Sequence, residues 1–274
     1  MKVFKKLALA TLLILALVIA AFNIWGFVTL GTMEPSANTT RDEQANRVVM
    51  VFGATGSVGD GLLKAAMEDP EVEQIHVVTR RTSPRIEAGV ASGKVQLHLK
   101  QDFTNYEDLA DELKEVNTVL WGLGTSSLLV DEATYTKIHV DFPLAFATAW
   151  LNARTQAPMS IHNVTGMGTD PAGSEQWARD KGRTEQTLAA MAQGTGLRSY
   201  SYRSAFVRPT SEQANPAHYL LEALLIPGSL VISADELGDA MLEISARGNE
   251  VANGSLIDNA DSIAYARAYQ NRIE

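Results

Sequence analysis

The stretch VFGATGSVGDG, residues 51–61, constrains the fold of this chain more than any other feature. It follows RVVMVFG, an apolar run typical of a buried strand, and leads into SVGDGLLKAAMED, whose apolar residues recur at helical spacing. Gly53, Gly56 and Gly59 stand three residues apart between the two. Such a junction needs a tight turn and close contact between helix and strand, which glycine permits because it has no Cβ. The stretch therefore predicts the first strand–helix crossover of a parallel sheet.

The same loop is suited to bind a dinucleotide. A helix that begins near Ser57 directs free backbone N–H groups and the positive end of its dipole toward the loop, where a pyrophosphate accepts them. A purely structural turn is the alternative interpretation. We expect the cofactor phosphates to contact the loop residues Gly53, Thr55, Gly56, Ser57, Val58 and Gly59.

Beyond the loop, short apolar segments alternate with longer amphipathic ones. The strand-like segments are QIHVVTRR, KVQLHLK, VNTVLWGLG, MSIHNVTG and LRSYSYRS. Helix-like segments such as DEATYTKIHVDFPLAFATAWLNAR and SEQWARDKGRTEQTLAAMA separate several of them. Strands alternating with helices predict a parallel sheet covered on both faces. The expected fold class is α/β, a Rossmann-type doubly wound parallel sheet over residues 47–274.

The N-terminus predicts a membrane anchor. Residues 7–33 contain no charged side chain, and Lys2, Lys5 and Lys6 precede them. About 20 apolar residues span a bilayer, and Trp25 stands near the far end, where interfacial aromatic residues belong. We expect residues 1–30 to form one transmembrane helix that contacts the lipid bilayer through residues 7–30. A cleaved signal peptide, whose apolar region is usually about 7–15 residues, and a buried helix are the alternatives.

Residues 31–46, GTMEPSANTTRDEQAN, are polar and lack apolar periodicity, so they predict a tether between the anchor and the domain. The side of the membrane is open. Three lysines before the anchor, against Arg41 and Arg47 after it, favour a domain outside the cytoplasm, whereas the supply of a nicotinamide cofactor favours the inside.

Two segments after later strands are further candidates for cofactor contacts. Arg80 and Arg81 end the second strand, where arginine accommodates the 2′-phosphate of NADP and an acidic residue binds the ribose of NAD. We therefore expect NADP, with NAD possible; a solvated basic pair is the alternative. After the third strand, Asp102 and Phe103 offer an acceptor for the adenine edge and an apolar wall, although Asp102 is equally suited to cap a helix.

The fourth strand ends in WGLGTSS, which places Gly122, Gly124 and Thr125 at the carboxyl edge of the sheet, where ligands of such sheets bind. A glycine-rich turn without a ligand is the alternative.

Composition excludes several other functions. The chain has no cysteine, so thiolate catalysis, disulfides and cysteine-based metal sites are excluded. Its formal net charge is −9, and no basic face indicates nucleic acid. The five histidines are scattered without the spacing of metal ligands, so we expect no metal.

The chain resembles the atypical short-chain dehydrogenase/reductases in the order of six segments. These are VFGATGSVGDG, VVTRR, WGLGTSS, IHVDFPLAFATA, HNVTGMGTD and DKGRTEQ. Within them, LGT and K-G-x-x-E are similar to the NAD(P)H-binding, Tat-interacting-protein-like oxidoreductases. The resemblance covers roughly residue 47 to the C-terminus. It implies a Rossmann core, an NADP(H)-type cofactor, and a small C-terminal part that shapes a substrate cleft.

Active enzymes of this kind use a Ser, a Tyr and a Lys, and the resemblance carries these roles to three positions here. Thr165 matches the serine and keeps a hydroxyl. Lys181 matches the lysine, which holds the ribose and lowers the pKa of the phenol. Trp177 stands where the tyrosine belongs, and an indole cannot act as a general acid or base. Ser204, after Arg203, departs from the branch's Arg-Pro.

Three other residues are candidate proton donors in place of the phenol. Tyr200 and Tyr202 lie on one face of a strand, where core or surface packing is the favoured interpretation. His162 has a useful pKa, but a lone histidine in a strand is usually a core residue with its hydrogen bonds satisfied. Two functions remain: an NADP(H)-dependent oxidoreductase acting on an unknown carbonyl or alcohol, or a dinucleotide-sensing scaffold without turnover that contacts a protein partner. The replacement of tyrosine by Trp177 favours binding without classical reductase chemistry.

Overall fold

The computed structural model describes residues 2–273 and is built around a parallel sheet of seven strands. In chain order the strands are β1 (Val48–Phe52), β2 (Gln74–Thr79), β3 (Val95–Leu99), β4 (Thr118–Trp121), β5 (Met159–Val164), β6 (Leu197–Arg203) and β9 (Leu256–Asp258). Their spatial order is β3-β2-β1-β4-β5-β6-β9. The order reverses between β1 and β4, and ligands of such sheets bind outside the carboxyl ends at this point. The predicted doubly wound α/β fold is confirmed.

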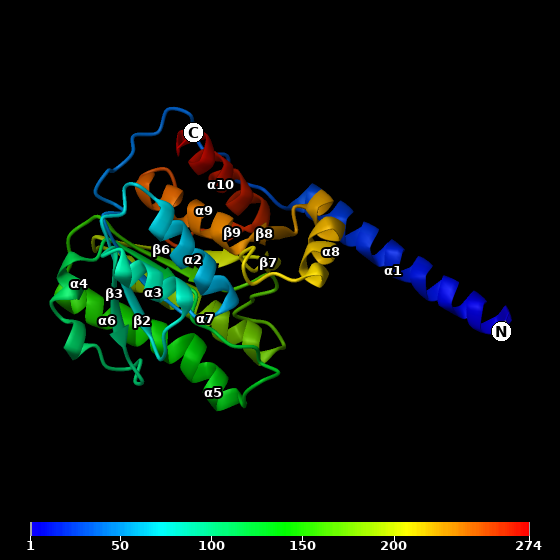
Figure 1. The fold of residues 1–274 in the computed structure, drawn as a ribbon, viewed down its shortest axis with the longest axis horizontal. Helices are drawn as coiled ribbons and strands as arrows, with labels where there is room; N and C mark the ends of the chain where they lie inside the picture. Colours follow the sequence, from blue (N-terminus) through cyan, green and yellow to red (C-terminus); the bar gives the residue numbers. More distant parts are fainter. Residues whose placement is uncertain (1, 274) are drawn as a thin grey trace.

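Helices cover both faces of the sheet (Figure 1). One layer contains α2 (Ser57–Glu68), α3 (Pro84–Ala91), α9 (Ala234–Ala246) and α10 (Asn259–Ile273). The other contains η1 (Glu107–Leu109), α4 (Glu112–Glu115), α5 (Glu132–Thr136), η2 (Lys137–Asp141), α6 (Phe142–Ala153) and α7 (Gln176–Ala192). The helix expected over DEATYTKIHVDFPLAFATAWLNAR is one continuous helical stretch, α5–η2–α6, interrupted by the π-helical turn η2.

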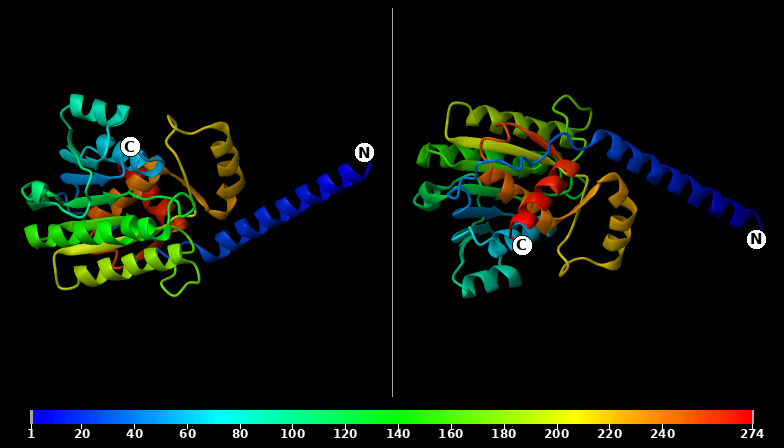
Figure 2. Two further views of the ribbon diagram at one scale, coloured as in Figure 1. Left: turned by 90° about the horizontal axis from the view of Figure 1, so that it is seen from below. Right: turned by 90° about the horizontal axis from the view of Figure 1, so that it is seen from above.

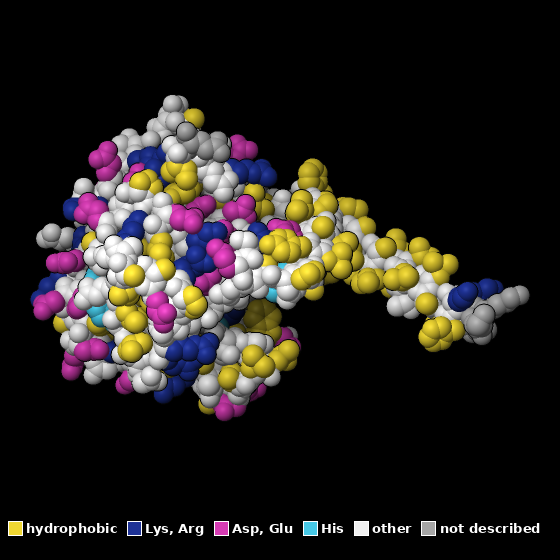
Figure 3. Space-filling view, in the orientation of Figure 1, with side chains coloured by type: hydrophobic (Ala, Val, Ile, Leu, Met, Phe, Trp, Pro, Cys, Tyr) yellow, Lys and Arg dark blue, Asp and Glu magenta, His cyan; other side chains and the backbone are white. Residues whose placement is uncertain are grey.

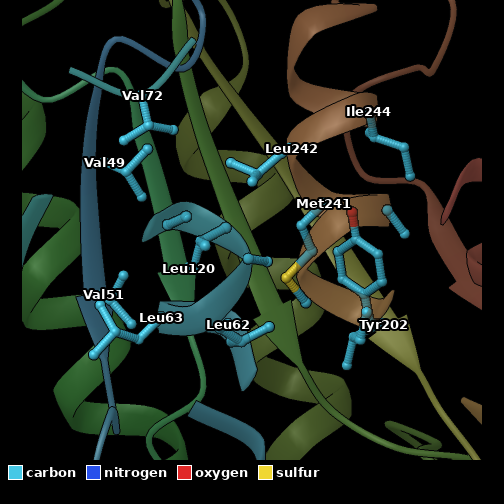
Figure 4. Close-up of a cluster of buried hydrophobic side chains, with 14 of the residues drawn as sticks. Val49, Val51, Leu62, Leu63, Val72, Leu120, Tyr202, Met241, Leu242 and Ile244 are labelled. Atoms are coloured by element: carbon cyan, nitrogen blue, oxygen red, sulfur yellow. The ribbon is translucent and has the colours of Figure 1, made fainter. Parts of the chain in front are cut away.

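Each helical layer encloses its own hydrophobic core. Val49 and Val51 of β1 pack with α2 and α9 on one face, where Leu62 and Met241 lie beside them (Figure 4). Phe52, the last residue of β1, packs on the opposite face with Trp121 and Phe146. This division follows from the strand geometry, because successive side chains point to opposite faces.

After the sixth sheet strand the chain makes an excursion out of the domain. A small parallel pair, β7 (Phe206–Arg208) and β8 (Val231–Ser233), brackets α8 (Pro216–Leu225) and η3 (Ile226–Gly228). None of the α8 side chains is buried, and α8 projects from the same side of the domain as the N-terminal helix (Figures 1 and 2). The excursion therefore has no hydrophobic core of its own.

The N-terminal helix α1 (Lys2–Thr29) extends away from the domain, and most of its side chains are exposed (Figure 2). Within it, Phe4–Thr29 is long and apolar enough to cross a membrane, a property that signal sequences share. One apolar N-terminal helix is thus present where the sequence predicts it.

The segment between α1 and β1, expected as a tether, is bonded along the domain. The backbone N–H groups of Thr32 and Met33 donate to Asp261 at 2.7 and 2.8 Å. The Ser36 N–H donates to Glu250 at 3.0 Å, and the Arg41 guanidinium pairs with the buried Glu243. These contacts fix the direction in which α1 leaves the domain.

Glu243 is the centre of this attachment. It is 1% exposed and pairs with Arg41 of the segment between α1 and β1, with Arg247 at 2.6 Å and with Arg272 at 3.5 Å. Because a charge without a partner is costly in the interior, removing one member of such a group usually destabilises a protein strongly.

Replacing Glu243 by Gln should therefore lower the free energy of unfolding by roughly 3–5 kcal/mol, since three guanidinium groups lose their shared carboxylate. Chemical denaturation of the full chain in detergent measures this. The matched control is Glu73→Gln, because Glu73 is 59% exposed and pairs with Arg47 at the surface. Solvent screens this pair, so the change should leave the free energy of unfolding nearly unchanged. Equal effects of the two changes would contradict this role of Glu243.

Candidate functional site

The glycine loop joins three elements by direct backbone contact. Gly53 has φ +77°, and a Cβ there would lie 2.5 Å from the carbonyl carbon of Gly122 after β4. A Cβ on Gly59 would lie 2.1 Å from the Gly53 carbonyl oxygen. Both distances are far below van der Waals contact. Only glycine therefore lets α2 begin so close to the ends of β1 and β4.

The first turn of α2 is open to a ligand. Its N-cap, Gly56, has no side chain to accept from the helix, so the first N–H groups lack intrahelical partners. Ser57 and Val58 of this turn line a cleft at the carboxyl edge of the sheet. An anion in this cleft would meet both the N–H groups and the helix dipole.

The one acidic side chain of this turn is neutralised. Asp60 is 4% exposed, accepts from Arg85 of α3 at 2.9 and 3.1 Å, and accepts from Thr210 at 2.8 Å. Its negative charge is thereby paired instead of opposing a phosphate.

The cleft collects residues from distant parts of the chain. Its walls come from the glycine loop, from the segment after β4, from the end of β5, from η2 and from α7. The lining residues are Gly56, Ser57, Val58, Gly122, Leu123, Gly124, Thr125, His139, Val164 and Lys181. Seven of the residues predicted to contact the cofactor therefore line this cleft. They are Gly56, Ser57, Val58, Gly122, Gly124, Thr125 and Lys181.

Arg80 and Arg81 directly follow β2, which pairs with β1 up to Phe52 and Val78. Both side chains are exposed, and among residues 2–273 neither takes part in an intrachain ion pair. They stand at the carboxyl edge, one strand away from the glycine loop, and their charges are available to a ligand.

Asp102 and Phe103 are placed differently from each other. The exposed Asp102 accepts from the Thr104 N–H at 2.9 Å and from its hydroxyl at 2.6 Å, and these bonds lower the pKa of its carboxyl. Phe103 is 2% exposed and packs on Phe52 and Phe142. Asp102 thus closes a local turn and caps no helix, because the N-cap of the following η1 is Tyr106. Phe103 belongs to the core behind the cleft.

Lys181 is the central charge of the cleft. Its ammonium donates to the carbonyl oxygen of Thr165. Burial lowers the pKa of Lys181 to about 8, and the nearby Glu185 carboxylate opposes that shift. The hydroxyl of Thr165 points away from the cleft: it is 1% exposed and donates to Glu185 at 2.7 Å. As the structure stands, Thr165 supports Lys181 through its carbonyl and offers no hydroxyl to a substrate.

Trp177 lies one helical turn before Lys181 at the start of α7, as the sequence predicts. It is half-buried, and its six-membered ring lies against Gly168, where a Cβ would be 3.2 Å from the ring. The indole covers the loop after β5 and offers no titrating group there.

His139 is a site residue that the sequence analysis passes over. It lies in the π-helical turn η2, and its Nε2 is 3.2 Å from the Thr125 N–H and 3.0 Å from the Thr125 carbonyl oxygen. Burial, with the Lys181 charge adding to it, lowers the pKa of His139 to about 4. A π-turn often marks a functional site, but it leaves no signature in the apolar periodicity.

The residues considered as replacements for the missing phenol lie in the core. Tyr200, Tyr202 and His162 are all 0% exposed. His162 contacts the Tyr202 hydroxyl at 2.8 Å and the Ser160 hydroxyl at 3.1 Å. None of the three lines the cleft, so the core interpretation of each is correct.

Solved structures with the same fold are short-chain dehydrogenases/reductases. An oxidoreductase of that family from Burkholderia thailandensis superposes with TM-score 0.59 at 16% identity, covering 84% of this chain and 98% of that one. The RhlG/NADP active-site complex of Pseudomonas aeruginosa gives TM-score 0.60 at 12% identity, covering 80% and 97%. A 3-oxoacyl-(acyl-carrier protein) reductase of Brucella melitensis in complex with NAD gives 0.57 at 15%, covering 80% and 97%. The expected short-chain dehydrogenase/reductase fold is confirmed.

Sequence comparison finds only relatives that match short parts of the chain. No family model matches the chain. Leucinostatins biosynthesis cluster protein T of Purpureocillium lilacinum is 26% identical over 102 residues, which is 37% of this chain and 37% of that protein. A hybrid PKS-NRPS synthetase, gkaA, of Penicillium citrinum is 29% identical over 70 residues, 26% of this chain and 2% of that protein. The matches thus span little more than a third of these relatives at most, and the Tat-interacting-protein-like branch stays an expectation.

The environment of His139 predicts an imidazole that stays neutral. Because burial holds the pKa of His139 near 4, its ring signals should not titrate between about pH 5 and pH 8 in a histidine NMR spectrum. Replacing Lys181 by Met removes the positive charge that lowers this pKa, so the midpoint should rise. Loss of the signal in His139→Gln assigns it. A midpoint near the unperturbed value of about 6.5 in the unmodified chain would contradict the burial described here.

Proposed function

We propose that this chain is a membrane-anchored protein that binds NADP(H) in the cleft beside the glycine loop and lacks the classical tyrosine-dependent reductase chemistry. The observation that carries the proposal is the contact of Gly59 with Gly53 and of Gly53 with Gly122, which any Cβ would prevent. This contact leaves the N-terminal turn of α2 open at the carboxyl edge. Such a cradle fits a pyrophosphate, whose charge the free N–H groups and the helix dipole stabilise.

Other residues suit the remaining parts of the cofactor. The guanidinium groups of Arg80 and Arg81 are placed to pair with a 2′-phosphate, which favours NADP(H) over NAD(H). The ammonium of Lys181 donates to the ribose hydroxyls while it keeps its bond to Thr165. Gly122, Gly124 and Thr125 line the opposite wall of the cleft. When bound, the nicotinamide supplies or accepts a hydride.

Proton transfer is where this chain departs from an active reductase. Trp177 occupies the helical turn before Lys181, and its indole N–H does not exchange a proton near neutral pH. The hydroxyl of Thr165 is bonded to Glu185, and the neutral His139 is bonded to Thr125. The cleft therefore offers no group in place of the tyrosine phenol that acts as the acid in active reductases, and none in place of their serine hydroxyl.

A second candidate function, an active oxidoreductase with another proton donor, is favoured by one observation. With a pKa of about 8, Lys181 carries a proton that it can release near the operating pH, which is the property required of a general acid. In this case Lys181 or water would protonate the oxygen of a carbonyl substrate.

Calorimetric titration of the full chain in nanodiscs should show micromolar binding of NADPH and weaker binding of NADH. The double variant Arg80→Gln/Arg81→Gln should reduce NADPH affinity roughly 10- to 100-fold, because charge-assisted hydrogen bonds contribute about 1.5–3 kcal/mol. NADH affinity should hardly change.

Arg267→Gln is the control, because Arg267 is an exposed arginine of α10 on the domain surface. It should bind both nucleotides as the unmodified chain does. If neither nucleotide binds at millimolar concentration, the ligand of the glycine loop is something else.

Replacing Trp177 by Tyr separates the two functions. If only the phenol is missing, NADPH oxidation with medium- and long-chain aldehydes should rise about 100-fold or more, the lower range of general acid catalysis. Trp177→Phe, which lacks the hydroxyl, is the matched control and should show no gain. Activity of the unmodified chain that Lys181→Met abolishes, with no gain in Trp177→Tyr, would instead favour the second candidate.

A further inference from the structure

Helix α8 exposes an apolar surface that the domain does not cover. In α8, Leu220 is 64% exposed, Tyr219 44%, and Leu221 and Leu224 39% each. Ile226, the first residue of η3, continues this surface and is 59% exposed. Contiguous apolar surface of this kind marks a site of contact with a protein or a membrane.

The apolar surface is attached directly to α1. The Asn23 side-chain amide donates to the carbonyl oxygen of Leu224 at 2.8 Å. A Cβ on Gly26 would lie 2.3 Å from the Gly228 carbonyl oxygen, and one on Gly228 would lie 2.6 Å from the Asn23 Cα. Helix α1 and η3 therefore meet backbone to backbone, and Figure 3 shows apolar side chains continuing from α1 over α8.

The point of contact coincides with the level where a membrane would end. About 20 residues of α-helix cover the ~30 Å of a bilayer's hydrocarbon core. Counted from Leu7, the first residue after the lysines, that distance ends near Gly26. Trp25, an aromatic residue suited to the interface, is 44% exposed at this level. In a membrane that α1 spans from Leu7, the leucines of α8 would therefore lie at the boundary between hydrocarbon and headgroups.

Helix α8 carries no free charge that would oppose insertion. Its one acidic residue, Glu222, accepts from Arg208 at 2.8 Å. His218 closes the capping box at its start by accepting from the Asn215 N–H at 3.1 Å. The surface is thus suited to uncharged hydrocarbon and offers nothing specific to anionic headgroups.

A cleft of about 890 Å³ opens at the same level. Ala21, Phe22 and Trp25 of α1 form one wall, and the loop after β5, with Met167 and Pro171, forms the other. The charged residues that line it are already engaged: Arg203 with Glu185 at 2.6 Å, Asp258 with the Gly31 N–H at 2.9 Å, and Asp170 with the Ala172 N–H at 2.9 Å. The rest of the lining is mostly apolar, and we call this cleft the apolar channel.

This apolar channel lies beside the cofactor cleft. The loop that forms its wall starts at Gly166, where a Cβ would lie 3.7 Å from the Lys181 Nζ. The same loop contacts the Trp177 ring through Gly168. A ligand whose hydrocarbon chain occupies the channel would thus have its polar end near the residues proposed to hold the nicotinamide half of the cofactor.

We propose that α8 lies in the bilayer leaflet that the C-terminal end of α1 reaches, and that the apolar channel takes the hydrocarbon chain of an amphipathic lipid from that leaflet. This inference rests on the proposed membrane anchor and cofactor cleft, and it names the substrate class: a lipid alcohol or carbonyl with a long apolar chain. The domain is thereby seated with the carboxyl edge of its sheet toward the membrane.

The first test is the depth of α8 in a membrane. Because the chain has no cysteine, Leu220→Cys and Ile226→Cys each give one site for an environment-sensitive fluorophore. In the full chain in phosphatidylcholine vesicles, lipid-borne spin labels should quench both fluorophores several-fold. Adding phosphatidylglycerol to the vesicles should leave the degree of quenching unchanged, because α8 has no free basic residue to bind an anionic headgroup. Val90→Cys, 45% exposed at the opposite edge of the domain, should not be quenched.

A fluorophore at Leu15→Cys in α1 shows whether a negative result concerns the seating of α8 or the membrane anchor itself. Quenching at residue 15 without quenching at 220 and 226 would leave α1 as an anchor and overturn the seating of α8. No quenching at residue 15 would overturn the anchor itself and this inference with it, while the NADPH titration would still test the cofactor cleft.

The second test addresses the apolar channel. A benzophenone attached at Met167→Cys should form adducts with phosphatidylcholine chains or with added hexadecanol under light, and mass spectrometry detects them. Ala21→Trp should reduce the adduct yield several-fold by narrowing the channel, whereas Ala20→Trp, the neighbouring residue that does not line it, should leave the yield unchanged. Thermal unfolding checks that each variant is folded. Equal yields in the two tryptophan variants, or no adduct at residue 167, would overturn the proposed lipid site.

Discussion

The backbone contact of Gly59 with Gly53, and of Gly53 with Gly122, is the constraint on which the rest of the structure depends. It brings the start of α2 against the ends of β1 and β4, where the strand order reverses. The two hydrophobic cores form on either side of these strands, and the candidate cleft lies at their carboxyl ends. Core packing and ligand geometry therefore share one requirement, the absence of a Cβ at these positions.

A second constraint fixes the N-terminal helix α1 to the domain. Polar contacts from Asp261, Glu250 and Glu243 hold the segment after α1 along the surface, and Gly26 packs on Gly228 at the end of the α8 excursion. The helix consequently leaves beside the loop that follows β5. This is why a segment far from the site in sequence forms a wall of a channel next to it.

The electrostatics of the cleft suit binding better than they suit the classical reaction. Burial lowers the pKa values of Lys181 and His139, the neighbouring Glu185 supports the lysine charge, and Trp177 contributes an apolar surface where a phenol would act. The same burial that lowers the pKa of Lys181 makes it the one titratable cleft residue whose protonation changes near physiological pH.

Local sequence patterns determined the alternation of strands and helices from β1 to β6, the apolar N-terminal helix and the Trp177–Lys181 spacing, because periodicity and spacing are set by residues close together in the chain. The spatial order of the strands and the late strand β9 required the tertiary structure. Tertiary structure decided which side chains face the cleft. The Thr165 hydroxyl points inward to Glu185, and His139 points into the cleft from a π-turn, since both orientations depend on partners distant in the chain. The docking of the α8 excursion on α1 likewise could not be predicted from the sequence, because backbone contact between Gly26 and Gly228 leaves no periodic pattern.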